Sequence, residues 1–315
     1  MSVDSHGTVL SVRPRRDGVI EGNLAALYGQ LQLPGDVESN LIVDSREVLA
    51  GTTRFVGARF GPIEVDTYIA QATFYVEQGM DPSGKTHATK WALANQVYGS
   101  SRIGGANYAQ VTKALLNLFR LELHAAGYNA ASDEYESEFL ELDRLLVKLR
   151  FDRQITLRTA APERYDAAAI GAQRDSTVQT QFADWHVRQI RGGYWASLDW
   201  EKLRSLAGAA KILWLLLSSP RIPFAALPQS PQLEELHVPL EVGSYRALGI
   251  KAKQDRDCRR VLSQAGQRIA AVDPSYEDIA VVPDRTRPKG FALSVVRRTA
   301  QSPLFGIPAL RADAA

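Results

Sequence analysis

Apolar residues recur three or four positions apart in three successive segments of the chain, a spacing typical of amphipathic helices. These predicted helices are residues 65–78, 87–98 and 106–120. A short strand is predicted before them at residues 52–57, and two strand-like runs, 121–128 and 138–152, follow them with a polar stretch in between. The predicted order in this part of the chain is therefore strand, three helices and hairpin.

A second series of elements follows in the same order. Strands are predicted at residues 177–182 and 194–198, and a helix capped by Asp199 is predicted to run to about residue 218. The later elements are helices at 239–248 and 254–271 and strands at 279–282 and 291–297. Because three helices and a hairpin occur twice, the pattern predicts an α+β fold of two tandem winged-helix domains.

The domain boundaries are placed where this pattern stops. Residues 1–45 lack sustained periodicity, and we expect them to form a largely flexible N-terminal arm. The first winged-helix domain is predicted at residues 46–172 and the second at residues 173–300. Residues 301–315 are expected to form a loosely ordered tail.

The composition favours a folded pair of domains over a membrane or disulfide-rich protein. The 315 residues fit two domains of ~150 residues each. The longest apolar run, Ile212 to Leu217, is far shorter than the ~20 residues that cross a bilayer. The N-terminus lacks a signal-peptide layout, and the single cysteine, Cys258, excludes an internal disulfide and a Cys-based zinc finger. We therefore expect a cytoplasmic protein with no membrane partner.

The net charge of +2 is unevenly distributed along the chain. Residues 1–175 hold 18 Lys or Arg and 22 Asp or Glu, whereas residues 176–315 hold 19 and 13. The range from Arg246 to Arg298 alone holds 12 basic and 6 acidic residues. A local basic surplus suits a polyanionic partner, although an ordinary solvated surface can show the same pattern.

The third helix of the second domain has the residue pattern of a DNA-contacting helix. Its apolar residues, which include Cys258 and Leu262, predict a buried face. The opposite face carries Arg256, Arg260, Ser263 and Gln267, and Arg and Gln side chains can hydrogen-bond base edges in the major groove. Residues expected to contact phosphates, beside this helix and in the following hairpin turn, are Lys251, Lys253, Arg259, Arg285, Arg287 and Lys289.

The first domain has a weaker version of this surface. The residues of its third helix that are candidates for base contacts are Arg102, Asn107, Gln110, Lys113 and Asn117. Its hairpin carries the acidic residues Asp133, Glu134, Glu136 and Glu138, which DNA phosphates would repel. We therefore expect this hairpin to stay away from DNA or to meet another protein.

Residues 79–86 match the phosphate-loop pattern GxxxxGK[ST]. A functional phosphate loop follows a buried strand and opens a helix at its Lys-Thr pair. Here the preceding residues predict a helix, and Pro82 offers no backbone N–H for a phosphate. We expect a turn between two helices and no nucleotide cofactor, and we keep a nucleotide-dependent enzyme as the third hypothesis.

The sequence shows no other motif for catalysis or metal binding. Its five histidines are scattered, with no His-x-His or His-x3-His pair to hold a metal ion. This also argues against a metal-dependent nickase with a tyrosine nucleophile. No Gly-x-Ser-x-Gly motif is present. We therefore expect a protein that is not an enzyme and that needs no cofactor or metal.

Several spaced positions resemble bacterial plasmid replication initiators with tandem winged helices, close to the group called replication initiator protein A. The residues that carry the resemblance are Phe60-Gly61-Pro62, Asp66, 75–79, Tyr108, Ala114-Leu115, Leu118, 193–199, Leu203, 206–217, Arg259, Leu262, Ala265 and 291–295. The resemblance implies sequence-specific binding of double-stranded DNA at origin repeats, origin melting and recruitment of host replication proteins. It also implies a plasmid- or nucleoid-associated protein and a possible homodimer through the first domain.

A winged-helix transcriptional repressor is the second hypothesis, because the sequence alone does not separate melting an origin from blocking a promoter.

Overall fold

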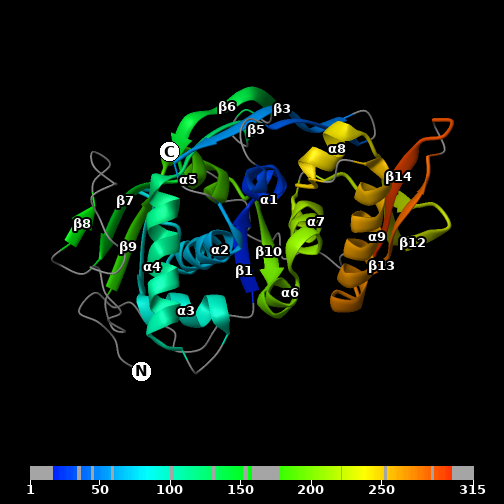
Figure 1. Ribbon diagram of the computed structural model, residues 1–315. Helices are drawn as coiled ribbons and strands as arrows, with labels where there is room; N and C mark the ends of the chain where they lie inside the picture. Colours follow the sequence, from blue (N-terminus) through cyan, green and yellow to red (C-terminus); the bar gives the residue numbers. More distant parts are fainter. Residues whose placement is uncertain are drawn as a thin grey trace, which may run out of the picture.

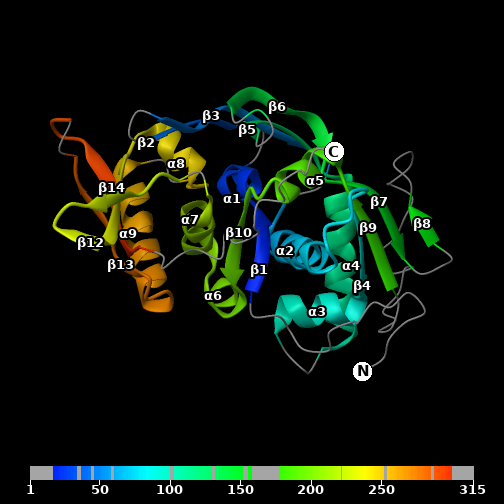
Figure 2. The same ribbon diagram turned by 180° about the vertical axis from the view of Figure 1, so that it is seen from behind.

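The computed structural model describes residues 17–33, 37–43, 46–57, 60–99, 103–129, 132, 134–151, 155–157, 177–220, 222–251, 254–284 and 287–299. They form a mixed arrangement of helices and strands (Figure 1). We refer to residues 37–157 as the first half of the chain and to residues 177–299 as the second half. Figures 1 and 2 show residues 62–120 toward one end of the molecule and residues 230–298 toward the other, with the N-terminal strand and helix between them.

The first half is built around three helices, α2 (Pro62–Glu77), α3 (Lys90–Tyr98) and α4 (Gly105–Arg120). Pro62 occupies the first turn of α2, where a missing backbone N–H costs nothing, and the Glu64 carboxylate accepts a hydrogen bond from Gly61 N at 3.1 Å. Helix α4 buries one face, which includes Tyr108, Val111 and Leu115, as its apolar spacing predicts.

The second predicted helix begins later than expected. Strand β4 (Lys85–Thr89) occupies its first residues, and α3 starts only at Lys90. The β4 segment alternates exposed and buried positions, and its two buried residues are Thr86 and Ala88. The Thr89 hydroxyl then caps α3 by accepting a hydrogen bond from Ala92 N at 3.0 Å.

The strands of the first half, together with β9 from the second half, form two four-stranded sheets. One has the order β2-β3-β5-β6, and Figure 1 shows it along one edge of the molecule, reaching the second half at α8. The other has the order β4-β9-β7-β8. The strand bounds are β2 (Val37–Val43), β3 (Arg46–Val56), β5 (Glu122–Asn129), β6 (Glu134–Arg144), β7 (Leu146–Phe151), β8 (Ile155–Leu157) and β9 (Thr177–Phe182).

The placement of β9 corrects the sequence analysis. Residues 177–182 were expected to open the second domain, but β9 pairs with β4 and β7 of the first half. The following helix α5 (Asp184–Arg191) was not predicted at all. Residues 177–182 therefore belong to a sheet of the first half rather than opening the second.

The second half contains a helical group and a four-stranded sheet with the order β11-β12-β14-β13. The predicted helix from Asp199 to residue 218 is in fact two helices, because the backbone is extended at Leu206 and Ala207 and left-handed at Gly208, with φ +56°. The bounds are β10 (Trp195–Asp199), α6 (Trp200–Ser205), α7 (Gly208–Ser218), β11 (Ala225–Leu227), β12 (Ser230–Pro239), α8 (Val242–Ala247), α9 (Asp255–Val272), β13 (Tyr276–Pro283) and β14 (Phe291–Arg298).

The expectation of an unstructured arm is wrong for residues 17–33. They form strand β1 (Asp17–Glu21), helix α1 (Gly22–Leu27) and a short 3₁₀ turn, η1 (Gln30–Gln32). Strand β1 pairs antiparallel with β10, from Asp17 opposite Asp199 to Glu21 opposite Trp195. All six residues of α1 are buried. Residues 1–16 and 301–315, which include the Arg13–Arg16 segment and the predicted tail, lie outside the described residues.

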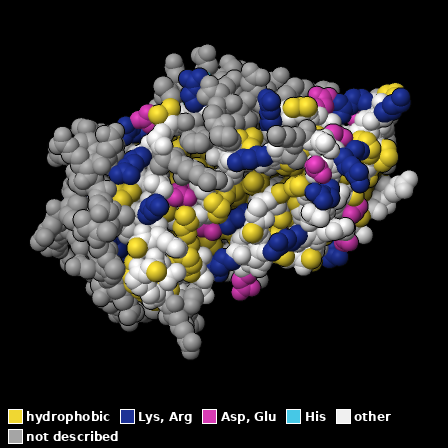
Figure 3. Space-filling model, viewed as in Figure 1, with side chains coloured by type: hydrophobic (Ala, Val, Ile, Leu, Met, Phe, Trp, Pro, Cys, Tyr) yellow, Lys and Arg dark blue, Asp and Glu magenta, His cyan; other side chains and the backbone are white. Residues whose placement is uncertain are grey.

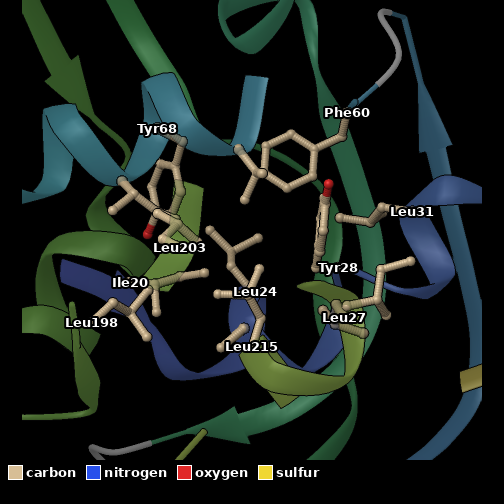
Figure 4. Packing of buried hydrophobic residues seen from close by; sticks show 14 of the residues in the cluster. Ile20, Leu24, Leu27, Tyr28, Leu31, Phe60, Tyr68, Leu198, Leu203 and Leu215 are labelled. Atoms are coloured by element: carbon tan, nitrogen blue, oxygen red, sulfur yellow. The ribbon is translucent and has the colours of Figure 1, made fainter. Parts of the chain in front are cut away.

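The core is continuous between the two halves (Figure 4). Leu24 and Leu27 of α1 lie among Leu215 of α7, Tyr68 of α2 and Leu203 of α6. Apolar side chains from both halves are therefore withdrawn from water by the same N-terminal segment, which ties the stability of one half to that of the other.

Polar contacts also cross between the halves. Lys211 Nζ on α7 lies 2.6 Å from Asp66 Oδ1 on α2, with both side chains largely buried. Arg204 donates to the backbone carbonyl of Gln96 at the end of α3, at 2.6 Å. Gly29 packs so closely that a Cβ there would lie 2.4 Å from the Ala247 carbonyl oxygen. These contacts fix how α6 and α7 sit against the first half.

A buried polar chain lies at this junction. The Glu21 carboxylate accepts hydrogen bonds from Asn23 N at 3.0 Å and Leu24 N at 2.9 Å, and thereby caps α1. Glu21 N donates to Tyr68 Oη, which lies 2.8 Å from His186 Nε2 on α5. Burial raises the pKa of Glu21 to about 7 and lowers the pKa of His186 to about 3.

Replacing Glu21 should change how the stability of the protein depends on pH. The folded protein holds a proton on Glu21 up to a pKa of about 7, whereas the unfolded chain releases it near 4.5. The contribution of this group to the unfolding free energy is therefore full below pH 4.5 and is lost as the pH rises through 7. From pH 5 to pH 8, Glu21→Gln should gain about 2 kcal/mol relative to the wild type in urea unfolding. His186 titrates in both proteins and cancels in the difference, so parallel pH profiles would contradict this account.

Candidate nucleic-acid interface

Helix α9 is anchored by the apolar face that the sequence predicts. Cys258, Leu262, Ala265 and Ile269 are buried, and the helix packs against β13 and α7. A Cβ on Gly266 would lie 2.4 Å from the Ile279 carbonyl oxygen, so only glycine lets α9 approach β13 this closely. The helix is therefore held rigidly, with its other face available for contacts.

The opposite face of α9 carries the side chains predicted to contact bases. Arg256, Arg260 and Gln267 are exposed, and Ser263 is half-buried. The Arg260 side chain is 70% exposed and lies 3.5 Å from Asp257, a weak surface ion pair. Arg268 is also exposed, at the edge of this face. The sequence analysis missed Arg268, although it lies four residues after the exposed Gln264 and helical spacing could have found it.

Basic side chains gather at the end of the molecule where α9 and the β13–β14 hairpin lie (Figure 3). Lys251, just before α9, and Lys289, in the hairpin turn, are both exposed. Lys253 and Arg285, which were also predicted to contact phosphates, lie outside the described residues. Acidic side chains are mixed with the basic ones on this face, as Figure 3 shows.

Two arginines predicted to contact phosphates, Arg287 and Arg259, pair with carboxylates of the protein itself. Arg287 Nε donates to Asp284 Oδ2 at 2.7 Å, and its Nη1 donates to Glu241 at the start of α8. Arg259 Nε lies 3.0 Å from Asp255 Oδ2, one turn earlier on α9. The Arg259 guanidinium also lies over the ring of Phe291 on β14, 3.7 Å from its centroid.

Helix α4, predicted as the third helix of the first domain, offers fewer unengaged side chains. Lys113 and Gln110 are exposed, and the Gln110 amide oxygen accepts a hydrogen bond from Tyr98. Asn107 accepts a hydrogen bond from Gly104 N at 3.1 Å and caps α4, whereas Asn117 donates to Glu64 at 2.7 Å. Arg102, Asp133 and the side chains of Glu134, Glu136 and Glu138 lie outside the described residues. Among the described residues of this half, Lys113 is the predicted DNA contact whose side chain is both charged and exposed.

Residues 79–86 do not have the geometry of a phosphate loop. Helix α2 ends at Glu77 before them, and strand β4 begins at Lys85 and pairs with β9. The order is helix, loop and strand, the reverse of the strand, loop and helix that cradle a phosphate. The turn expected here therefore joins a helix to a strand rather than two helices.

Other candidate chemistry is limited in the part of the chain that is described. That part contains no cluster of three potential metal ligands of the His, Cys, Asp or Glu type. It also contains no helix with the length and apolarity of a bilayer-spanning segment. Cys258 is buried, and burial raises the pKa of its thiol, which disfavours the reactive thiolate.

A cavity of about 360 Å³ lies where β10 meets α6, α7 and the start of β13. Its charged side chains already have partners, because Lys202 Nζ is 2.7 Å from Asp273 Oδ1 and Arg297 Nε is 2.9 Å from Glu234. The indole Nε1 of Trp214 also donates to Asp273, at 2.9 Å. The two contacts of Asp273 join the C-terminal end of α9 to α6 and α7.

Solved structures of other proteins show a similar arrangement of elements. No protein-family model and no curated protein matches the sequence. Among solved structures, the chain is similar to the crystal structure of the Pi initiator protein in complex with iteron DNA, with a TM-score of 0.50 at 9% identity, over 92% of this chain and 100% of that one. Domains 2 and 3 of RctB are similar over 88% of this chain and 97% of theirs, at 10% identity and a TM-score of 0.45. The resemblance to initiators that the sequence indicates is thus confirmed at the level of the fold, which this chain shares with an initiator protein.

Proposed function

We propose that this protein binds double-stranded DNA at origin repeats and initiates plasmid replication. The fold that it shares with an iteron-binding initiator supports this proposal. So does the order of its elements, because α2, α3, α4 and the β5–β6 hairpin are matched by α7, α8, α9 and the β13–β14 hairpin. We interpret these two groups as winged-helix units in which α4 and α9 face the major groove.

The observation that carries the proposal is the exposed face of α9. Arg256, Arg260 and Gln267 lie on a helix whose other face is fixed against β13, and Lys251 and Lys289 flank it. Arg can bind guanine and Gln can bind adenine through paired hydrogen bonds, and flanking lysines suit phosphates. Binding and positioning DNA need no catalytic group, so the proposal is for a protein that is not an enzyme.

The two halves should contribute unequally to binding. On α4 the polar side chains Asn107 and Asn117 are engaged in a helix cap and in a bond to α2. We propose that the first half adds a modest DNA contact through Lys113 and offers its surface to a second copy of the chain or to host replication proteins.

Substitutions on α9 should weaken DNA binding more than a substitution on α4. Arg256→Ala or Arg260→Ala should each reduce affinity about tenfold, because a base contact is worth ~1–3 kcal/mol. Lys113→Ala should reduce affinity only a few-fold. The measurement is a fluorescence titration at fixed salt, with a duplex that the wild-type protein has selected from a random-sequence library.

The salt dependence gives an internal control for this comparison. A lost phosphate contact lowers the slope of log K against log salt by about one, whereas a lost base contact leaves the slope nearly unchanged. Equal losses of affinity for the α4 and α9 variants would contradict the unequal roles of the two halves.

A genetic test separates an initiator from a repressor. The gene with its flanking DNA should maintain a plasmid that has no other origin, and Arg256→Ala with Arg260→Ala should abolish this maintenance. Failure of maintenance by the wild-type gene, together with silencing of a reporter promoter by the same flanking DNA, would favour the transcriptional repressor instead.

A further inference from the structure

The arginine in the β13–β14 turn is held by two carboxylates from different elements. Asp284, at the end of β13, has a side chain with no exposed surface, and it accepts from Arg287 Nε at 2.7 Å. Glu241, the N-cap residue of α8, accepts from Arg287 Nη1. These contacts raise the pKa of Arg287, and the two carboxylates balance its charge within the protein.

The turn itself is closed beside this arginine. Asp284 N donates to the Gly290 carbonyl oxygen at 2.9 Å, and Gly290 N donates to the Arg287 carbonyl oxygen at 3.0 Å. Lys289, between them, has a left-handed backbone with φ +64° and an exposed side chain. The bonds of Arg287 therefore set where the lysine at the tip of the turn stands relative to α8.

A second arginine has the same kind of environment on α9. Arg259 forms an ion pair with Asp255, 3.0 Å from Nε to Oδ2 and without hydrogen-bond geometry, and stacks on Phe291, the first residue of β14. Asp255 also accepts a hydrogen bond from Tyr245 Oη on α8, at 2.6 Å. This network joins α8, the first turn of α9 and the hairpin.

We propose that Arg287 and Arg259 are positioning residues, which hold the β13–β14 turn and α9 in fixed relation to α8, rather than residues that bind DNA phosphates. The inference rests on the proposed function and divides its basic residues into two classes. Lys289, Lys251, Arg256 and Arg260 have exposed side chains that can reach DNA, and the pair of Arg260 with Asp257 is loose at 3.5 Å. Arg287 and Arg259 are half-buried and pair more closely with the protein's own carboxylates.

Removing a carboxylate partner of Arg287 distinguishes the two roles by the sign of the effect. If Arg287 binds a phosphate, Glu241→Gln or Asp284→Asn makes the turn more positive and strengthens DNA binding. If Arg287 is a positioning residue, both changes weaken binding although they remove negative charge. We expect a loss of about two- to fivefold for Glu241→Gln, a partly exposed pair, and of about tenfold for the buried Asp284→Asn.

Three further variants complete the design. Glu277→Gln is the matched control, because Glu277 pairs with Arg298 at the opposite end of the hairpin, at 2.6 Å, and this variant should not weaken binding. Arg287→Lys keeps the charge but loses the planar fork that reaches both carboxylates, and it should not restore binding. Lys289→Ala should weaken binding in the wild-type protein and have little further effect when combined with Arg287→Lys.

A measurement without DNA tests the same contacts independently. Hydrogen exchange at the amides of Asp284 and Gly290 should accelerate in Asp284→Asn and Glu241→Gln, and not in Glu277→Gln, at an unchanged melting temperature. Stronger DNA binding by either carboxylate variant, or full binding by Arg287→Lys, would overturn the proposal. If the wild-type protein binds no duplex DNA, the proposed function fails, and unchanged exchange would then also refute the positioning role.

Discussion

The pairing of β1 with β10 is the contact on which the rest of the molecule depends. It places residues 17–33 between the two halves and brings α1 against α7. Leu24 and Leu27 then enter one core with side chains of α2 and α6. Without this strand pair, the apolar faces of α2 and α7 would each lose part of the surface that buries them, and the contacts of Lys211 with Asp66 and of Arg204 with Gln96 would lose the packing around them.

Much of the fold could be predicted from the sequence because its helices are strongly amphipathic. The spacing of Tyr108, Val111 and Leu115 located α4, and that of Cys258, Leu262 and Ile269 located α9. Short elements were harder to recognise. Helix α5 is only eight residues long, so its apolar spacing repeats too few times to stand out along the sequence. Strand β9 was found, but no local pattern says that its partner is β4 rather than β10.

The N-terminal segment was missed for a different reason. Its glycines and buried polar residues look like those of a mobile arm, but here they serve close packing. Gly29 lies where a Cβ would meet the Ala247 carbonyl oxygen, and Glu21 caps α1 from a fully buried position. For the candidate site, helical spacing placed Arg256, Arg260 and Gln267 on the exposed face. It did not show that Glu241 lies beside Arg287, because that contact joins residues 46 positions apart.

The position of β1 in the chain has a consequence for synthesis. Asp17 is made early, but its partner Asp199 leaves the ribosome only after most of the first half has been translated. At about 5–20 residues per second, the N-terminal strand waits on the order of ten seconds or more for β10. During that interval the apolar side chains of α1 have no α7 to cover them. An apolar segment of the nascent chain thus stays uncovered, and it is the kind of sequence that chaperones bind, until the second half emerges to enclose it.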